Sequence, residues 1–280
     1  MIVDHAVRVS VKGLKGFSVK DVMDQALSGG AIRQQDLLES PPQYTDLQIQ
    51  RSSMKQPKIG AVKMTRMGML PTPLTSGSFA SVCNVAVKQA YDRKYTSQTE
   101  FKPIPIRGAV QLQKLMSELT CMGWANALYD STMAHIVRVV DHKGPPPFRV
   151  PKMRFVASAL AQTAEDGDSF MLEECIDGER GGQFVKYIHN ASAQVLKDKL
   201  PSPEYIMRGE FLSFVQHHQY WDTSKLAFTS DFQGKILHLE CLQLFNIYPG
   251  SLKLLTDPQI ITDPYVSTFG TYFNLTPYDE

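Results

Sequence analysis

The expected fold is decided by Ala227-Phe228-Thr229-Ser230-Asp231-Phe232-Gln233-Gly234, together with the later stretch Leu252-Lys253-Leu254-Leu255-Thr256-Asp257-Pro258. Each is a short apolar run that ends in polar residues, which is typical of a buried strand running into a turn. Asp231, Gln233 and Asp257 at the ends of neighbouring strands would present only oxygen ligands, which Mg²⁺ prefers. Two ordinary turns are the alternative, because Asp, Gly and Pro are common turn residues. The rest of the chain has to decide between the two interpretations.

The composition is that of an ordinary soluble globular protein, with 43% hydrophobic and 20% charged residues in a chain of 280. This length holds one large domain or a two-lobed one. The net charge of +1 gives no basic field that would attract nucleic acid, and no run reaches the ~20 apolar residues of a membrane span. We therefore expect no nucleic-acid or membrane partner. The N-terminus has no signal-peptide core, so we expect a cytoplasmic or nuclear location.

The cysteines are scattered and form no C-x-x-C pair. Each lies in an apolar context, which favours buried free thiols in a reducing compartment over a disulfide framework or a complete zinc site. The four are Cys83, Cys121, Cys175 and Cys241.

Residues 1–57 are weakly patterned and are expected to form a partly disordered N-terminal extension. Residues 2–11 alternate like a strand and residues 19–27 can form a short helix. The polar run 40–56, however, resembles a linker.

A small-residue turn follows the strand expected over residues 58–70. In Ser76-Gly77-Ser78-Phe79, Gly77 would let backbone N–H groups approach a phosphate. Lys88, at the end of the next apolar run Val85-Ala86-Val87, would reach that phosphate as a point charge. A surface lysine on an amphipathic strand is the alternative.

Residues 110–127 have the strongest helical pattern, and the helix is expected to continue to residue 140 and to stop at Gly144-Pro145-Pro146-Pro147. Glu118 flanks its apolar stripe. It would pair with Lys88, as a helix glutamate does in many phosphoryl-transfer folds, or it would be solvated.

The second half of the chain alternates strands and one helix. Strands are expected over residues 148–160, 169–175 and 184–190, with a hairpin turn over 165–168 and a helix over 204–220. His217 lies beside the apolar stripe of that helix. A structural histidine is the usual interpretation there, and a metal ligand needs other support.

The motifs occur in the order seen in alpha-type (atypical) protein kinases, and the resemblance covers residues 58–266. The chain is most similar to the fungal members, which also carry segments like Pro145–Phe148 and Gln216-His217. The motif sets of ordinary protein kinases are absent. The matching motifs are Val85–Lys88, Met171–Glu174, Phe184–Asn190, Glu210–Phe214, Asp231–Gly234 and Leu255–Ile260.

This resemblance implies an α+β, two-lobed kinase-like fold that transfers the γ-phosphoryl group of ATP to Ser or Thr of a protein substrate. It implies an N-lobe over residues 58–172, β-rich with one long helix, and a catalytic C-lobe over residues 173–280. The implied roles are ATP-binding lysine for Lys88, adenine-binding hinge for Glu173 and Glu174, and phosphate-side asparagine for Asn190. Those in the C-lobe are catalytic aspartate for Asp231 and Mg²⁺ ligands for Gln233 and Asp257.

The chain departs from the family between its two acidic motifs. Asp231 and Asp257 are 26 positions apart, whereas the corresponding family residues are ten apart. Removing residues 235–250 restores the family spacing, so this apolar segment is an insertion in the expected metal site. One hypothesis is a translated intron, since Gly234-Lys235 can encode a GTAAG donor and Pro249-Gly250 an AG acceptor. A genuine loop insertion is the alternative.

The second departure lies near the C-terminus. The family continues to a Gly-rich loop and to a histidine and cysteines that complete a structural zinc site. His217 matches the upstream histidine of that site, but no later Cys or His follows Asp257. Tight zinc binding needs about four ligands. The sequence therefore predicts a vestigial zinc position, no bound zinc and an incomplete C-lobe.

Three functions follow from these observations. The first is an active alpha-type kinase. The second is an inactive relative or incomplete product that binds a nucleotide or a protein partner. The third is an unrelated α+β binding module. The last leaves the ordered motifs unexplained.

Overall fold

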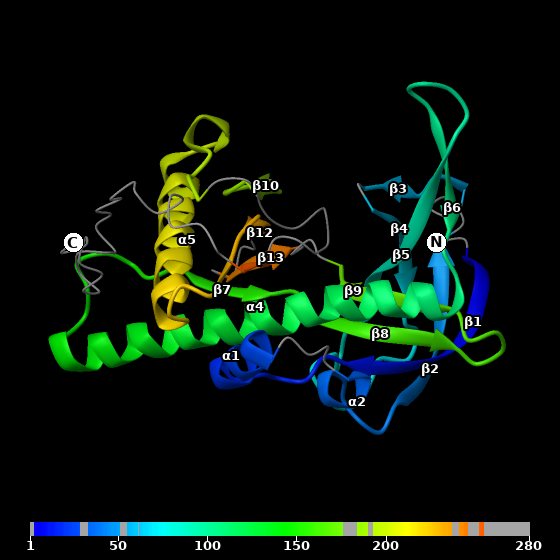
Figure 1. Ribbon diagram of the computed structural model, residues 1–280, viewed down its shortest axis with the longest axis horizontal. Helices are drawn as coiled ribbons and strands as arrows, with labels where there is room; N and C mark the ends of the chain where they lie inside the picture. The colour runs from blue at the N-terminus through cyan, green and yellow to red at the C-terminus, as the bar shows by residue number, and fades with distance from the viewer. Residues whose placement is uncertain are drawn as a thin grey trace. The chain divides into compact units, whose positions relative to one another are not determined.

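The computed structural model describes residues 3–28, 33–50, 55–60, 62–175, 184–189, 193–236, 241–245 and 252–254 (Figure 1). The chain divides into two units. Unit 1 comprises Met1–Lys15, Ile32–Thr120 and Val156–Ile176, and unit 2 comprises Gly16–Ala31, Cys121–Phe155 and Asp177–Glu280. Asn190, Asp257 and the remainder of the C-terminal segment lie outside the described residues.

Unit 1 is built on an eight-stranded sheet with the order β3-β4-β2-β1-β8-β9-β5-β6. β4 also pairs with β5, so six of the strands close into a barrel-like ring. The short helix α2 (Gln34–Leu37) belongs to the same unit. The strands are β1 (Val3–Gly13), β2 (Gln43–Gln50), β3 (Lys58–Ile59), β4 (Lys63–Met69), β5 (Asn84–Tyr95), β6 (Phe101–Pro105), β8 (Ser158–Thr163) and β9 (Ser169–Glu174).

One side of this sheet forms an apolar inner core. Side chains alternate between the two sides of a strand, so each strand contributes every second residue. The connection between β4 and β5 closes the core with three further apolar side chains. The core contains Val9, Val11, Leu47, Ile49, Leu70, Leu74, Phe79, Val85, Val87, Ala159, Ala161, Phe170 and Leu172.

The prediction of a partly disordered extension over residues 1–57 is wrong for the strands described there. β1 lies inside the sheet, paired with β2 and β8 over registers such as Val9↔Thr45 and Val9↔Thr163. Val9 and Val11 of β1 belong to the inner core, and Val7 packs against it. The pairing partner β8 is about 150 residues away in the sequence, and a local sequence pattern contains no information on so distant a pairing.

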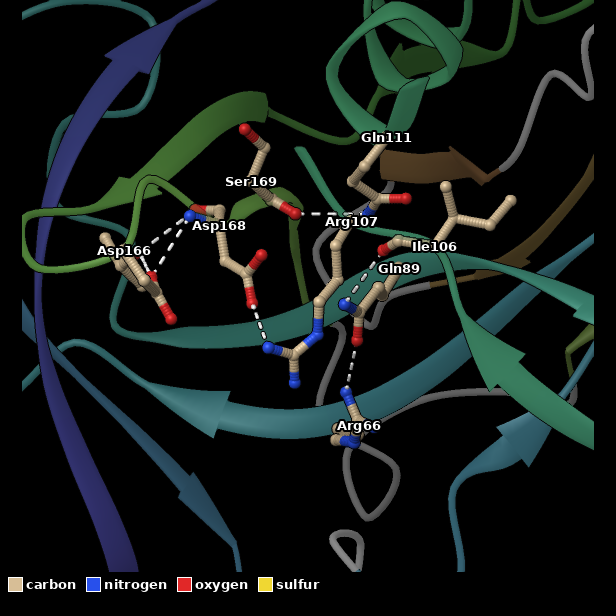
Figure 2. Close-up of polar contacts among 9 residues, drawn as sticks. Arg66, Gln89, Ile106, Arg107, Gln111, Asp166, Asp168 and Ser169 are labelled. Carbon is tan, nitrogen blue, oxygen red and sulfur yellow. Dashed lines mark hydrogen bonds and ion pairs between the residues drawn. The ribbon is translucent and has the colours of Figure 1, made fainter. Parts of the chain in front are cut away.

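One continuous helix, α4 (Gly108–Lys143), supplies residues to both units. In unit 1, Gln111 Nε2 donates to the Ser169 carbonyl at 3.1 Å, and Arg107 Nη1 lies 3.7 Å from Asp168 Oδ2 (Figure 2). These contacts fix the first turns of the helix against the start of β9. Glu118 lies two turns after Gln111, on the same side of the helix.

The helix ends where the sequence predicts. Gly144 has φ +88°, a left-handed conformation that favours glycine, and its N–H donates to the Val140 carbonyl at 2.8 Å.

Unit 2 contains the four-stranded sheet β10-β12-β13-β7 and the two-stranded sheet β11-β14. The expected helix over residues 204–220 is confirmed as α5. The elements are α1 (Val19–Ser28), β7 (Lys152–Phe155), β10 (Val185–Lys186), the 3₁₀ helix η1 (Lys197–Lys199), α5 (Pro203–Asp222), β11 (Ala227–Thr229), β12 (Gln233–Ile236), β13 (Cys241–Phe245) and β14 (Leu252–Leu254).

The strands β11 and β14, which carry the two motifs around Asp231 and Asp257, are neighbours. β11 and β14 pair antiparallel, with Ala227 opposite Leu254 and Thr229 opposite Leu252. In this register, Asp231 follows the end of β11 that lies beside the start of β14. The convergence of Asp257 on Asp231 stays a prediction, since Asp257 is outside the described residues.

The inserted segment contributes a paired strand. β12 and β13 form an antiparallel hairpin with Gln233 opposite Phe245, and β13 pairs in parallel with β7 on its other side. A sheet strand is a natural place for an apolar segment, because both backbone edges are hydrogen-bonded. Whether the segment is a translated intron stays a hypothesis, which transcript reads across codons 234–251 would decide.

Two smaller observations complete the fold. Among the described helices, none is long and apolar enough to cross a membrane. Among the described cysteines, Cys121 and Cys175 are half-buried and Cys83 is exposed, so none of the three is fully buried as expected.

Candidate functional site

Lys88 lies in the middle of the unit 1 sheet. On β5 it stands opposite Thr65 of β4 and Met171 of β9, and its side chain points away from the inner core, since its neighbour Val87 is part of that core. Lys88 is only 5% exposed, and its Nζ lies 2.5 Å from Glu173 Oε2. The alternative of a surface lysine is therefore wrong.

A second buried ion pair lies on the same side of the sheet. Lys63 of β4 faces Ala90, which is two residues beyond Lys88 on β5, and its ammonium group pairs with the carboxylate of Glu118 from α4. Glu118 is 4% exposed, so it is not solvated. Its salt-bridge partner is Lys63, and Lys88 pairs with Glu173 instead.

The two pairs form one electrostatic cluster of two cations and two anions. Burial lowers the pKa of Lys88, and the Glu173 carboxylate opposes that shift. Burial raises the pKa of Glu118, and the Lys63 ammonium opposes that shift. The charges of Lys63 and Glu173 reach across to Lys88 and Glu118, so the four groups act on one another as a set. Such a set tolerates burial because each charge has an opposite partner.

Glu174, the other predicted hinge residue, lies at the end of β9. Its N–H donates to the Ala157 carbonyl at 2.9 Å, and its carboxylate accepts from the Ala157 N–H at 3.2 Å. These bonds hold the end of β9 against the start of β8. An adenine-binding role for Glu173 and Glu174 stays a prediction.

The structure brings Gly77 to Glu39 and not to Lys88. Phe79, two residues after Gly77, packs in the inner core with Val87, on the side of the sheet opposite to the Lys88 side chain. The Glu39 carboxylate accepts the Ser78 N–H at 2.7 Å and lies directly against Gly77. The geometry therefore gives no support to a phosphate site shared by Gly77 and Lys88.

Gly77→Ala is expected to destabilise unit 1. Gly77 has φ +84°, and an added Cβ would collide with the Glu39 carboxylate. The left-handed conformation alone costs about 1–2 kcal/mol for a residue with a side chain, and moving the Glu39 carboxylate aside would also break its hydrogen bond with the Ser78 N–H. Gly144→Ala is the matched control, because Gly144 has φ +88° with open space around the Cβ position. Equal losses in the free energy of unfolding would contradict the contact with Glu39.

Asp231 occupies a strained, buried position in unit 2. Its φ is +62°, an uncommon conformation for a residue other than glycine, and its side chain is 1% exposed. The carboxylate forms an ion pair with Lys186 of β10. Such outliers persist only where the surroundings over-determine the backbone, and they cluster at functional sites.

The chain on both sides of Asp231 is held by hydrogen bonds. The Tyr187 N–H donates to the Phe232 carbonyl at 2.8 Å, and Ser230 Oγ donates to the His189 carbonyl at 3.1 Å. Lys186 also lies opposite Gln233 in the β10–β12 pairing. Asp231, Lys186 and Gln233 therefore lie together: Lys186 is in β10, Gln233 is in β12, and Asp231 is in the connection between β11 and β12.

The metal ligands are only partly within the described residues. Asp231 and Gln233 are oxygen donors suited to Mg²⁺, but Asp257 lies outside. Within the described ranges, no group of three or more His, Cys, Asp or Glu side chains is arranged to hold a metal ion. The Mg²⁺ site stays a prediction.

His217, at the predicted zinc position, has a structural contact. Its Nε2 accepts the Trp221 indole N–H at 2.8 Å, and burial lowers its pKa. The adjacent His218 packs against His135 with ring centroids 4.4 Å apart, and its Nδ1 lies 3.3 Å from Thr132 Oγ1. Burial, and secondarily the neighbouring His135, lower the pKa of His218 to about 4.

Several residues were not given roles from the sequence. Lys63 carries no local signal, because a lysine in a strand usually points to solvent, and Lys186 appeared only within the Phe184–Asn190 motif. Gln216 appeared only as part of a motif. Their partners come from distant elements, and only the fold brings them together.

A buried lysine–glutamate pair on a β-sheet and a buried, strained aspartate after a strand are features of a kinase-like domain. The alpha-kinase family profile matches residues 79–272, more than half of the chain, and the chain belongs to the alpha-kinase family. Its fold is accordingly the α+β fold of alpha-kinase domains.

Two solved structures are similar to the chain. One is a catalytic-domain mutant of myosin heavy chain kinase A, with 10% identity and a TM-score of 0.48, covering 87% of this chain and 83% of that one. The other is the alpha-kinase domain of myosin heavy chain kinase A in complex with ADP, with 10% identity and a TM-score of 0.44, covering 86% of this chain and 82% of that one. No curated protein sequence matches the chain.

Proposed function

We propose that the chain transfers the γ-phosphoryl group of ATP to Ser or Thr side chains of a protein substrate. The observation that carries this proposal is Asp231, buried at φ +62° beside Lys186 in the D-x-Q-G motif of the family. Phosphoryl transfer depends mainly on positioning and on neutralising charge, and a rigidly held carboxylate serves the first of these.

Each residue has a part in the proposed reaction. Lys88 would exchange its Glu173 partner for a phosphate oxygen of ATP, and Glu173 and Glu174 would hold the adenine. Asp231 would accept the proton of the substrate hydroxyl as the hydroxyl oxygen bonds to the γ-phosphorus and the bond to ADP breaks. Gln233 and Asp257 would hold Mg²⁺, which neutralises phosphate charge when bound. Asn190 would lie on the phosphate side.

A second function is favoured by one observation. Gln233 is the first residue of β12, and β12 forms a hairpin with β13 of the inserted segment. If this hairpin keeps Asp257 from joining Gln233, the chain binds nucleotide through Lys88 without transferring phosphoryl groups. Neither proposal involves the family's zinc.

The test is incorporation of label from γ-labelled ATP with Mg²⁺ by the purified chain, followed by identification of the phosphorylated residues. Phosphoserine or phosphothreonine that disappears with Asp231→Ala would support the first function. A folded chain that binds ATP but incorporates no label would support the second. Incorporation only by a variant lacking residues 235–250 would locate the defect in the insertion. Label on other residue types would contradict the Ser/Thr assignment.

A further inference from the structure

The edge of β11 that faces away from β14, just before Asp231, is hydrogen-bonded by side chains of α5 and of its C-cap residue Thr223. Within the described part of the chain, no strand pairs with this edge. Gln216 Nε2 donates to the Thr229 carbonyl at 2.8 Å, and Gln219 Oε1 accepts the Thr229 N–H at 2.7 Å. Thr223 Oγ1 accepts the Ala227 N–H at 3.0 Å, and its single hydrogen is shared between the Ala227 and Gln219 carbonyls, both at 2.8 Å. The N–H of Ala227 and both backbone groups of Thr229 thus each have a side-chain partner, and the Ala227 carbonyl shares the Thr223 hydroxyl.

The spacing explains why a helix can do this. Gln216 and Gln219 of α5 and the C-cap residue Thr223 are three and four positions apart, so they lie along one side of the helix. Ala227 and Thr229 are two positions apart, so their backbone groups point to the same edge of β11. Phe228, between them, lies opposite Lys253 of β14 at the other edge. The helix therefore takes the place that a neighbouring strand would have.

The roles of the two carboxamides are fixed by chemistry. A carbonyl oxygen needs a donor and an N–H group needs an acceptor, so Gln216 must present its NH₂ group and Gln219 its oxygen. Gln216, Gln219 and Thr223 are all buried, and Thr229 is fully buried. Water cannot replace a lost partner at such a position, so each bond is costly to lose.

We propose that Gln216, Gln219 and Thr223 are positioning residues that fix the strand leading into Asp231 and so hold the carboxylate in its strained conformation. Only one residue separates the clamped Thr229 from Asp231, so a shift of the strand moves the carboxylate directly. Only the expected effect of these residues on phosphoryl transfer rests on the proposed function. The clamp itself is testable without any activity.

The effect on catalysis should fall on the turnover rate. Displacing a reacting group by about 1 Å can cost about 10²-fold in rate. We expect Gln216→Met and Gln219→Met to lower kcat by roughly that factor and to leave KM for ATP unchanged, because neither residue belongs to the Lys88 cluster. Gln113→Met, at an exposed position of α4, is the control and should leave both values unchanged.

Amide hydrogen exchange of the nucleotide-free protein provides the independent measurement. The Thr229 amide should exchange faster in Gln219→Met, whereas it keeps its acceptor in Gln216→Met. Gln219→Glu retains an oxygen acceptor and should restore protection of the Thr229 amide relative to Gln219→Met. Gln216→Glu carries the same charge but loses the donor to the Thr229 carbonyl, so it should not restore kcat.

The outcomes separate the two proposals. An inactive wild-type chain whose Thr229 amide responds as described would contradict the kinase proposal and support the clamp. An active chain whose variants keep the wild-type kcat, or whose Thr229 exchange is the same in all variants, would overturn the clamp. If Gln216→Met or Gln219→Met loses its cooperative melting transition, Thr223→Val, which removes the hydroxyl bonded to Ala227, is compared with Thr223→Ser, which keeps it. Equal kcat in these two variants would overturn the clamp.

Discussion

Asp231→Asn is expected to lower the rate of phosphoryl transfer by about 10²–10⁴-fold, the usual contribution of a positioned general base. The carboxamide has nearly the shape of the carboxylate but does not accept a proton from the substrate hydroxyl. Asn also adopts the left-handed conformation readily, so φ +62° remains accessible and the fold should persist. ATP binding, which we propose for the Lys88 cluster of unit 1, should be unchanged.

The measurement is single-turnover transfer with labelled ATP beside a direct titration of ATP binding. Asp198→Asn, at an exposed aspartate of η1, is the control and should behave as wild type. Wild-type turnover by Asp231→Asn would exclude Asp231 as the proton acceptor. A parallel loss of ATP binding would show that the substitution acts outside the chemical step.

Lys63→Met is expected to destabilise unit 1 by about 3–5 kcal/mol, the cost of leaving one member of a buried ion pair unpaired. The substitution removes the ammonium group and leaves the Glu118 carboxylate buried without its direct partner. The double variant Lys63→Met/Glu118→Leu removes both charges. It should recover most of the loss, because an apolar pair of similar size often replaces a buried ion pair without cost.

Denaturant unfolding measures these changes as free energies of unfolding. Arg8→Met is the matched surface control in the same unit, because Arg8 and Asp46 form an ion pair at 3.2 Å with both side chains more than half exposed. That change should cost less than about 1 kcal/mol. A Lys63→Met effect no larger than that of Arg8→Met, or a double variant as unstable as the single one, would contradict the buried pairing.

The sequence determined the elements whose signals are local. The helical stripe of α4 and its Gly-Pro stop, the apolar runs of β5, β9 and β11, and the helix α5 all follow from periodicity and turn residues within short windows. The order of the short motifs determined the family, because each motif is a contiguous group of residues and can be recognised without knowing the fold. Lys88 and Asp231 were found in this way.

Tertiary structure alone decided the partners. β1 became a central strand because β8, about 150 residues later, pairs with it. Glu118 pairs with Lys63 because both lie on one side of the sheet, a relation that neither residue's neighbours reveal. In the sequence, Gln216 and Gln219 are ordinary helix residues, and only the fold shows that they hydrogen-bond to the backbone of β11. Burial, hydrogen bonding and charge pairing depend on distances between remote segments, and a linear pattern contains no such distances.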